Sequence, residues 1–126
     1  MITGGGKFIV STEVKWYEKY IGFPFLMFGS NPNTGIDCGN LIKYVYKQDA
    51  GTLKHGWEKV TTPDIFNVIT LTIGATNCTN HCALYVAKNR ILQTMTEHES
   101  WIAPYGRYYQ QYTTGIYKWN PIHIQI

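Results

Sequence analysis

The amino-acid sequence predicts an α+β domain whose N-terminal helices pack on one side of an antiparallel sheet. Apolar residues at helical spacing are confined to the first half of the chain. From Asp64 onward, β-branched and aromatic residues gather in short runs separated by turn residues, which is typical of strands. Helices followed by a run of strands favour an α+β architecture. With 126 residues the chain is large enough to bury a core without disulfides or a metal, and we expect one domain over residues 1–126.

The first helix is expected over residues 11–20. Its start is indicated by the polar sequence Ser11-Thr12-Glu13. An apolar stripe follows, made of Trp16, Tyr17 and Tyr20. Gly22 and Pro24 end this helix, and the polar, Gly-rich residues 1–10 are expected to form a flexible start.

A second helix is expected to begin at Cys38. The sequence Asn31-Pro32-Asn33-Thr34-Gly35 is a strong turn signal, and Asp37 can cap the helix start. The apolar face of this helix is made of Leu41, Ile42, Tyr44 and Val45. The helix is expected to fade between residues 48 and 51. Residues 52–63 contain no clear period and are expected to form a surface excursion.

Four strands are expected in the second half of the chain. Their ranges are 65–73, 81–87, 90–96 and 113–119. A polar loop over residues 74–80 separates the first two strands, and a turn at Lys88-Asn89 joins the second to the third. The sequence contains no internal repeat, no low-complexity segment and no domain linker.

Composition and charge exclude several classes of function. The net charge is +3 and the eleven Lys and Arg residues are scattered, so nothing resembles the basic surface of a nucleic-acid binder. No apolar run has membrane-spanning length, and the first residues lack the pattern of a signal peptide. We therefore expect no nucleic-acid partner, no membrane insertion and no secretion signal.

The three cysteines predict neither a disulfide framework nor a metal site. They are Cys38, Cys78 and Cys82. An odd number argues against paired cysteines, so folding in a reducing compartment is the simpler expectation. Cys78 and Cys82 have the sequence spacing of a metal pair, but in a strand they would lie about 13 Å apart, four rises of about 3.3 Å. No metal or other cofactor is expected.

Cys38 is the candidate nucleophile. At the first turn of a helix, backbone N–H groups and the positive end of the helix dipole stabilise the thiolate, which is the nucleophilic form of cysteine. The alternative for a cysteine at this position is a small buried residue that packs under the helix. The turn-rich loop in front of Cys38 and the cap offered by Asp37 favour the nucleophile.

A cysteine nucleophile needs a base, and the base needs a group that fixes its tautomer. His81 is the candidate base because it begins a rigid apolar strand and can be aimed at a fixed helix end. The alternative for a histidine on such a strand is a structural residue. The other histidines, which are expected at the surface, are His55, His98 and His123. Strand parity places His81 on one face of the sheet and Cys82 on the other, so Cys82 is expected to be a core residue.

Gln93 is the candidate third residue, because its amide oxygen can accept a hydrogen bond from the imidazole N–H. The hairpin turn decides whether Gln93 reaches His81. A two-residue turn that pairs residues 87 and 90 points Gln93 away and puts Thr94 in its place, whereas a three-residue loop restores Gln93. The sequence leaves both possibilities open.

Two blocks of the sequence resemble the NlpC-type cell-wall peptidases, a family of papain-like cysteine enzymes. The block over residues 22–41 resembles their nucleophile segment. The block over residues 80–93 looks like their histidine strand and the strand that carries the third polar residue. Residues 103–109 and the strand at 116–119 resemble the branch of the family found in the tail tips of siphophages. The similarity covers about residues 12–119.

The resemblance implies a papain-like cysteine peptidase fold in which Cys38 is the nucleophile, His81 the general base and Gln93 the orienting group. It implies hydrolysis of the stem or cross-bridge peptides of peptidoglycan through a thioester intermediate, with no cofactor. The tail-tip branch implies a protein that is made in the host cytoplasm, is located in the virion and has other tail-tip proteins as partners.

The sequence departs from the family pattern at three places. Gly39-Asn40 reverses the usual position of the glycine after the cysteine. Phe25 or Leu26 stands where an aromatic hydroxyl is often found, and Gln93 stands where the commonest residue is His. These changes keep the nucleophile and the base but thin the shell that orients the substrate. Two alternatives follow: a catalytically silent structural or assembly component of the tail tip, and a related papain-like amidase or acyltransferase.

Overall fold

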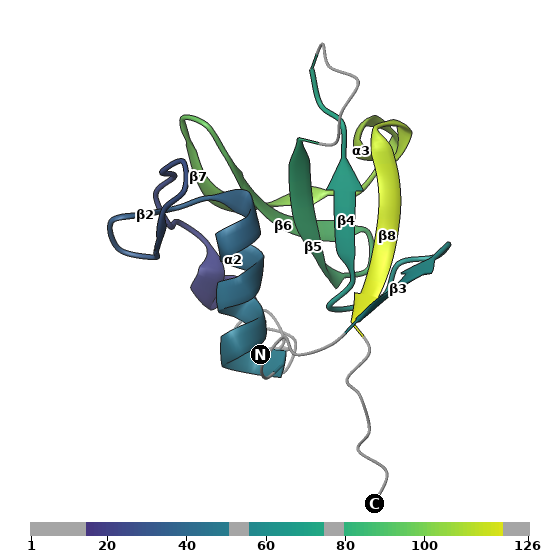
Figure 1. Cartoon of the computed structure of the whole chain (residues 1–126), viewed down its shortest axis with the longest axis horizontal. Helices are drawn as coiled ribbons and strands as arrows, with labels where there is room; N and C mark the ends of the chain where they lie inside the picture. Colours follow the sequence, from purple (N-terminus) through teal and green to yellow (C-terminus); the bar gives the residue numbers. More distant parts are fainter. Residues whose placement is uncertain (1–14, 51–55, 75–79, 120–126) are drawn as a thin grey trace, which may run out of the picture.

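The computed structural model of the protein describes residues 15–50, 56–74 and 80–119 (Figure 1). Its helical elements are η1 (Glu18–Tyr20), α2 (Cys38–Val45), the π-helical turn η2 (Tyr46–Ala50) and α3 (Arg107–Gln111). Its strands are β1 (Ser30–Asn31), β2 (Gly35–Ile36), β3 (Trp57–Val60), β4 (Val68–Leu71), β5 (His81–Ala87), β6 (Arg90–Met95), β7 (His98–Pro104) and β8 (Thr113–Trp119). The predictions for residues 1–10, His55, Cys78 and His123 concern positions outside the described residues.

Six of the described strands form one antiparallel sheet. Their order is β3-β8-β4-β5-β6-β7, and every neighbouring pair is antiparallel. The strands β5, β4 and β8 lie side by side, β3 forms one edge, and β6 and β7 lie beyond β5 (Figure 1). The strands β1 and β2 form a separate two-stranded ladder. This arrangement confirms the predicted α+β class.

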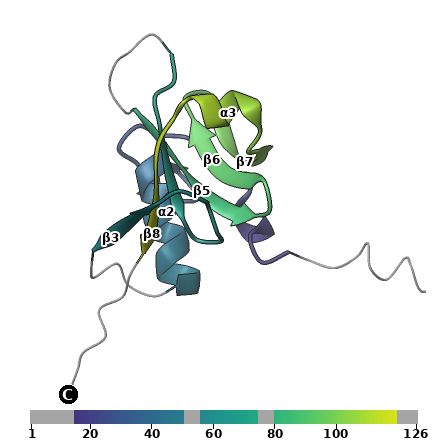
Figure 2. The same ribbon diagram turned by 90° about the vertical axis from the view of Figure 1, so that its right-hand side faces the viewer.

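Apolar side chains pack in two clusters that follow the alternation of the strands. The first cluster, which lies against α2, includes Tyr20, Leu41, Val45 and Leu84. The second cluster, against which Tyr109 of α3 packs, includes Ile69, Ala83, Tyr85 and Ile91. Because successive side chains of a strand point to opposite faces, β5 contributes to both clusters. Figure 2 shows α2 and α3 on opposite sides of β5 and β8. The N-terminal helical elements therefore cover one face of the sheet, as predicted.

A tight loop places the start of α2. Asp37 caps the helix, as predicted, because its carboxylate accepts a hydrogen bond from the backbone N–H of Asn40 at 2.9 Å. In front of the cap, Gly35 has φ of +145°, and a Cβ at this position would lie 2.3 Å from the Cβ of Leu26. Only glycine fits such a close approach. The loop geometry thus sets where the helix begins.

The strongest local patterns predict their elements well. The helix α2 begins at Cys38, and η2 continues it to Ala50, within the predicted end. The strands β5 and β8 have the predicted bounds, and β6 ends one residue earlier than predicted. These segments combine clear periodicity with turn residues at their ends.

The predicted helix over residues 11–20 is wrong in its described part, where only the short 3₁₀ helix η1 forms. Tyr17 and Tyr20 are buried in the first cluster, so their apolar spacing reflects packing against α2 and the sheet. The chain then attaches to β7, because the backbone N–H groups of Gly22 and Phe23 donate to the carbonyl and the hydroxyl of Ser100, each at 2.8 Å. Tertiary contacts therefore override the local helical pattern.

Five of the described elements are missed by the sequence patterns: the two-residue strands β1 and β2, the strands β3 and β7, and the helix α3. The described part of the surface excursion expected over 52–63 does lie at the surface, but residues 57–60 form the strand β3, whose first three residues are exposed and show no alternation. The strand expected over 65–73 is shorter, because residues 64–67 form a turn in which Phe66 has φ of +73°. His98 is exposed, as expected, but it begins β7 after a turn at Glu97.

Candidate functional site

Cys38 lies at the first turn of α2, in a frame of hydrogen bonds made by its neighbours. One carboxylate oxygen of Asp37 accepts from Asn40, and the other accepts from the backbone N–H of Phe28 at 3.0 Å. The backbone N–H of Asp37 and the side-chain amide of Asn40 both donate to the carbonyl of Gly29, at 3.1 and 3.0 Å. The loop over residues 28–29 is therefore bound to the helix start on both sides of Cys38.

His81 and Gln93 are brought together in the interior. The Nε2 atom of His81 lies 2.7 Å from Oε1 of Gln93, and their exposed fractions are 7% and 0%. An amide oxygen only accepts hydrogen bonds, so Nε2 of His81 is the donor. This leaves Nδ1 of His81 as the nitrogen available to Cys38. The pair has the geometry in which an amide orients an imidazole.

The register of the β5–β6 hairpin resolves the choice between Gln93 and Thr94. The turn has two residues and pairs Ala87 with Arg90, which alone would point Gln93 away from His81. A bulge follows, so that Tyr85 pairs with Ile91. Without the bulge, Tyr85 would pair with Leu92. The extra residue reverses the parity and brings Gln93 to the face of His81.

Thr94, the alternative to Gln93, has another partner. Its hydroxyl donates to the carbonyl of His98 at 3.0 Å, so it ties β6 to β7. The structure thus brings together Cys38, His81 and Gln93 from α2, β5 and β6.

The surroundings of Cys38 favour its thiolate. Hydrogen bonding from the thiol of Cys82 is the largest effect, and it acts with hydrogen bonding and charge from His81 to lower the pKa of Cys38 to about 4. Partial burial opposes this shift. The same contact with Cys38, together with burial, raises the pKa of Cys82 far above its usual range. We conclude that Cys38 carries the negative charge and Cys82 carries the proton.

The contact between Cys38 and Cys82 was missed by the sequence patterns. Parity correctly places Cys82 on the face of the first cluster, but Cys82 is half-buried and is not a core residue of the kind expected. Since α2 begins opposite the first residues of β5, its N-terminal cysteine meets the thiol of Cys82. Two cysteines 44 positions apart give no local signal of such a contact. Neither Cys38 nor Cys82 is part of a disulfide.

Tyr109 is a further residue that the sequence patterns missed. Its hydroxyl accepts a hydrogen bond from Nε2 of Gln93 at 2.9 Å. It comes from α3, an element without a predicted helical period. A tyrosine among the ten of this chain carries no local signal for such a role.

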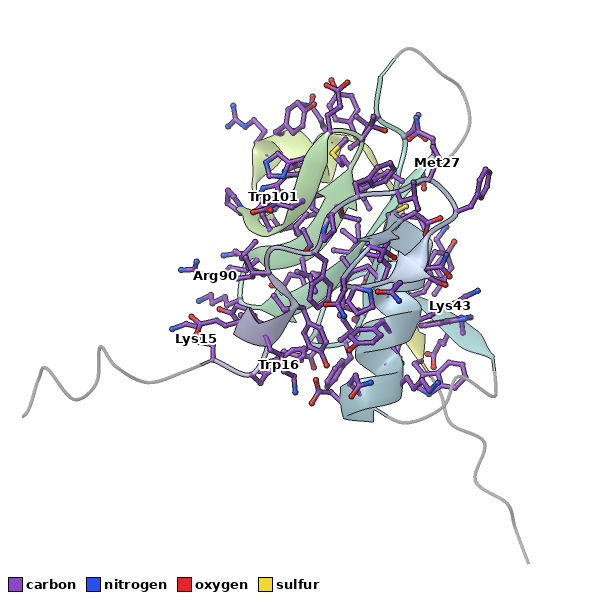
Figure 3. The ribbon with its side chains drawn as sticks, turned by 90° about the vertical axis from the view of Figure 1, so that its left-hand side faces the viewer. Lys15, Trp16, Met27, Lys43, Arg90 and Trp101 are labelled. Carbon is purple, nitrogen blue, oxygen red and sulfur yellow. The ribbon has the colours of Figure 1, made fainter. Side chains whose placement is uncertain are left out.

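A pocket of about 350 Å³ opens at Cys38 and His81. Its apolar lining consists of Phe25, Met27, Ile73 and Met95. Its polar lining includes Asp37, Asn80, Thr94 and Thr96. Figure 3 shows Met27 in the loop next to the N-terminal end of α2, whereas Lys43 points outward from the helix. A substrate in this pocket would meet both the sulfur and the imidazole.

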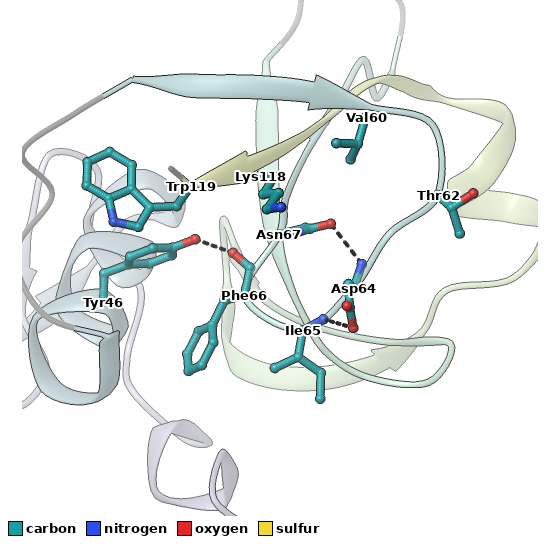
Figure 4. Close-up of a pocket in the computed structure, with 9 residues that line it drawn as sticks. All are labelled: Tyr46, Val60, Thr62, Asp64, Ile65, Phe66, Asn67, Lys118 and Trp119. Atoms are coloured by element: carbon teal, nitrogen blue, oxygen red, sulfur yellow. Dashed lines mark hydrogen bonds between the residues drawn. The ribbon is translucent and has the colours of Figure 1, made fainter. Parts of the chain in front are cut away.

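A second pocket, of about 440 Å³, lies between η2 and the turn over residues 64–67 (Figure 4). Several of the polar groups drawn there bond one another. Tyr46 donates its hydroxyl to the carbonyl of Phe66, and Asn67 accepts from the backbone N–H of Asp64 at 2.8 Å. Neither the candidate nucleophile nor the candidate base lines it, so this pocket is not the candidate site.

The residues that the structure describes, 15–50, 56–74 and 80–119, contain neither a metal-binding cluster nor a membrane-spanning helix. Within these ranges, no group of three or more His, Cys, Asp or Glu side chains is placed to hold a metal ion. None of the helices in this part of the chain has both the length and the apolar character needed to cross a membrane.

A helix that begins with a cysteine and packs on an antiparallel sheet, with a histidine at the start of the facing strand, defines a papain-like fold. Comparison with solved structures shows that the fold is that of NlpC/P60 proteins. No protein-family model matches the chain.

Three solved structures share this fold. A lipoprotein-like protein of the NLP/P60 family from Staphylococcus aureus has a TM-score of 0.64 and 24% identity, over 84% of this chain and 39% of that chain. The NlpC/p60 domain of the peptidoglycan hydrolase SagA has a TM-score of 0.59 and 19% identity, over 79% of this chain and 90% of that chain. An NlpC/P60 family protein from Bacillus cereus has a TM-score of 0.67 and 18% identity, over 81% and 37%.

One curated relative also matches in sequence. The Gamma-DL-glutamyl hydrolase of Bacillus subtilis (strain 168) is 28% identical over 118 residues, which covers 85% of this chain. The match spans 29% of the relative's own length, so this chain corresponds to only part of that protein.

Proposed function

We propose that the protein is a cysteine peptidase that hydrolyses peptide bonds in the stem or cross-bridge peptides of peptidoglycan. Cys38 would be the nucleophile, His81 the general base and Gln93 the orienting group. The observation that carries this proposal is the contact series at the site: Cys38 with a lowered pKa beside His81, and His81 bonded to Gln93 at 2.7 Å. The NlpC/P60 fold and the likeness to a γ-glutamyl hydrolase support the substrate class.

The proposed reaction assigns one step to each of the reacting side chains. The thiolate of Cys38 attacks the carbonyl carbon of the scissile amide, and the resulting oxyanion lies near the backbone N–H groups at the start of α2. His81 gives its proton to the leaving amine, so the C–N bond breaks and a thioester remains. Water then attacks the carbonyl carbon of the thioester, and His81 accepts a proton from this water. The C–S bond breaks, the carboxylic acid product is released, and Cys38 is again a thiolate.

We further propose that the protein works at the tail tip of a phage, with other tail proteins as partners. The support is the likeness of residues 103–109 and 116–119 to the siphophage branch of the family. Such a place would bring the enzyme to the cell wall on the particle itself. Mass spectrometry of purified tailed particles tests this location. Detection of the chain in the particles supports it, and detection only in the soluble fraction contradicts it.

Digestion of purified peptidoglycan tests the activity. The wild type is compared with Cys38→Ala and His81→Ala, and His98→Ala serves as the matched control because His98 is exposed and outside the pocket. We expect new muropeptides, identified by mass spectrometry, from the wild type and from His98→Ala only. The mass of each product identifies the bond that is cut.

The opposite outcome has a definite meaning. If the wild type releases no product while Cys38 is reduced and reacts with a small alkylating reagent, the peptidase proposal fails. We would then propose that the protein is a catalytically silent component of the tail tip. The three departures from the family pattern are consistent with this alternative. Phe25, which has no hydroxyl to offer a substrate, lines the pocket in either case.

A further inference from the structure

We infer that Tyr109 is a positioning residue of the candidate site, which holds the amide of Gln93 so that its oxygen faces His81. The inference deepens the proposed function, because it rests on the proposed roles of His81 and Cys38. It assigns a task to α3, the short helix on the face of the sheet opposite α2 (Figure 2).

The geometry is a continuous line of contacts. Nε2 of His81 donates to Oε1 of Gln93 at 2.7 Å, and Nε2 of Gln93 donates to the hydroxyl of Tyr109 at 2.9 Å. Each end of the amide thus has its own partner. The line runs from Cys38 on α2 through β5 and β6 to α3.

The amide of Gln93 needs such an anchor. Its two ends have nearly the same shape, and the terminal torsion of a glutamine side chain is soft, so packing alone selects neither orientation. If the amide turned over, its NH₂ group would face His81. A protonated imidazole has N–H donors on both nitrogens, so this orientation would set donor against donor and disfavour the thiolate–imidazolium pair.

Tyr109 is itself held in place. Its carbonyl accepts from the hydroxyl of Thr113 at 2.9 Å and from the backbone N–H of Tyr112 at 3.2 Å. Its ring packs against the second apolar cluster and makes an edge contact with Tyr108, with ring centroids 4.9 Å apart. A rigid hydroxyl beside a fully buried amide is a good positioning group, because the buried NH₂ would otherwise lose a partner.

The chain offers a matched control in the neighbouring tyrosine. Tyr108 is 54% exposed, and its ring contacts are with Tyr109 and Tyr112. Tyr108→Phe and Tyr109→Phe remove the same atom from adjacent residues of one helix. Only Tyr109→Phe removes the bond to Gln93.

The test measures the pH dependence of alkylation of Cys38 by iodoacetamide, followed on the Cys38 peptide by mass spectrometry. This rate needs no peptide substrate. We call the pH range in which the alkylation rate rises as Cys38 loses its proton the acid limb. We expect Tyr109→Phe to move the midpoint of this acid limb to higher pH by about half a unit to one unit, the order expected for loss of one hydrogen bond. Tyr108→Phe should keep the wild-type limb. Nitrogen NMR of His81, recorded at alkaline pH where the imidazole is neutral, should show the Nε2–H tautomer in the wild type and a mixture in Tyr109→Phe.

A double-mutant cycle with Gln93→Ala decides whether Tyr109 acts through Gln93. We expect Tyr109→Phe to have no further effect on the acid limb in the Gln93→Ala background. A full effect in that background, or a wild-type profile and wild-type tautomer for Tyr109→Phe, would overturn the inference. If the expected shifts appear but peptidoglycan is never cleaved, the inference stands and the proposed function fails.

Discussion

The carboxylate of Asp37 binds the backbone N–H of Phe28 at 3.0 Å, although Phe28 has φ of +65° and is 86% exposed. Apolar burial does not hold a residue so exposed in this strained conformation. The hydrogen bond to Asp37 holds Phe28 in this conformation instead. Asp37 is also the cap of α2 and directly precedes Cys38. The loop that borders the candidate pocket and the helix that presents the cysteine therefore share one side chain.

Substitution of Asp37 should separate these two tasks. Asp37→Ala loses the helix cap and the loop contact, and we expect it to lower the free energy of unfolding by about 1 to 2 kcal/mol. Asp37→Ser keeps a cap for Asn40 but loses the second oxygen that Phe28 uses, so its loss should be smaller. Urea denaturation with a common slope measures both. Equal stability of Asp37→Ala and the wild type would contradict the cap.

Alkylation of Cys38 should follow its lowered pKa. Since the pKa is about 4 instead of the ordinary value of 9.0, the thiolate is already formed at every pH well above 4. We expect the rate of reaction with iodoacetamide to rise through pH 4 and to be nearly level from pH 6 to 8. A free cysteine in a peptide, measured alongside, should gain rate about tenfold per pH unit over that range. A rate for Cys38 that climbs in parallel with the free cysteine would contradict the thiolate.

Removal of the Cys82 thiol should raise the pKa of Cys38. Cys82→Ala deletes the largest effect that lowers it, so the acid limb of alkylation should move to higher pH. Cys82→Ser retains a hydroxyl donor and should move the limb less. The two variants have similar volumes, so their difference reports the hydrogen bond. Identical limbs for Cys82→Ala and the wild type would mean that His81 and the backbone N–H of residue 82 suffice to hold the thiolate.

Gly35→Ala should destabilise the loop in front of α2. The new Cβ would lie 2.3 Å from Leu26, at a backbone φ of +145° that alanine disfavours. We expect a loss of about 1 to 3 kcal/mol in the free energy of unfolding, the range typical of overpacking. Gly56→Ala is the control, because a Cβ there meets no atom within 4 Å. Thermal unfolding compares the two, and similar midpoints would show that the loop can relax.

The elements that local patterns predict are those with strong periodicity and clear ends. The second helix, the histidine strand and the last strand lie where the sequence predicts them, because their apolar faces repeat with the period of the element they form. The strand β3 could not be predicted in this way, since its exposed residues have no alternation and its formation depends on β8 as a partner.

The candidate site shows the same division. Cys38, His81 and Gln93 can be selected from the sequence by residue type, position in an element and resemblance to a family. Their assembly depends on the bulge between Tyr85 and Ala87, which is a property of the hairpin and not of either strand alone. The contact with Cys82 and the bond to Tyr109 join segments that are distant in sequence.

The sequence by itself determined the fold class, the capped helix that starts at Cys38 and the strands that carry His81 and Gln93. These features follow from local periodicity, turn chemistry and helix capping, which act between near neighbours in the chain. Only the tertiary structure decided that Gln93 and not Thr94 faces His81, that Cys82 supports the thiolate and that Tyr109 holds Gln93. The physical reason is that register, hydrogen bonding and burial across the sheet arise from long-range packing, for which a single sequence has no local signal.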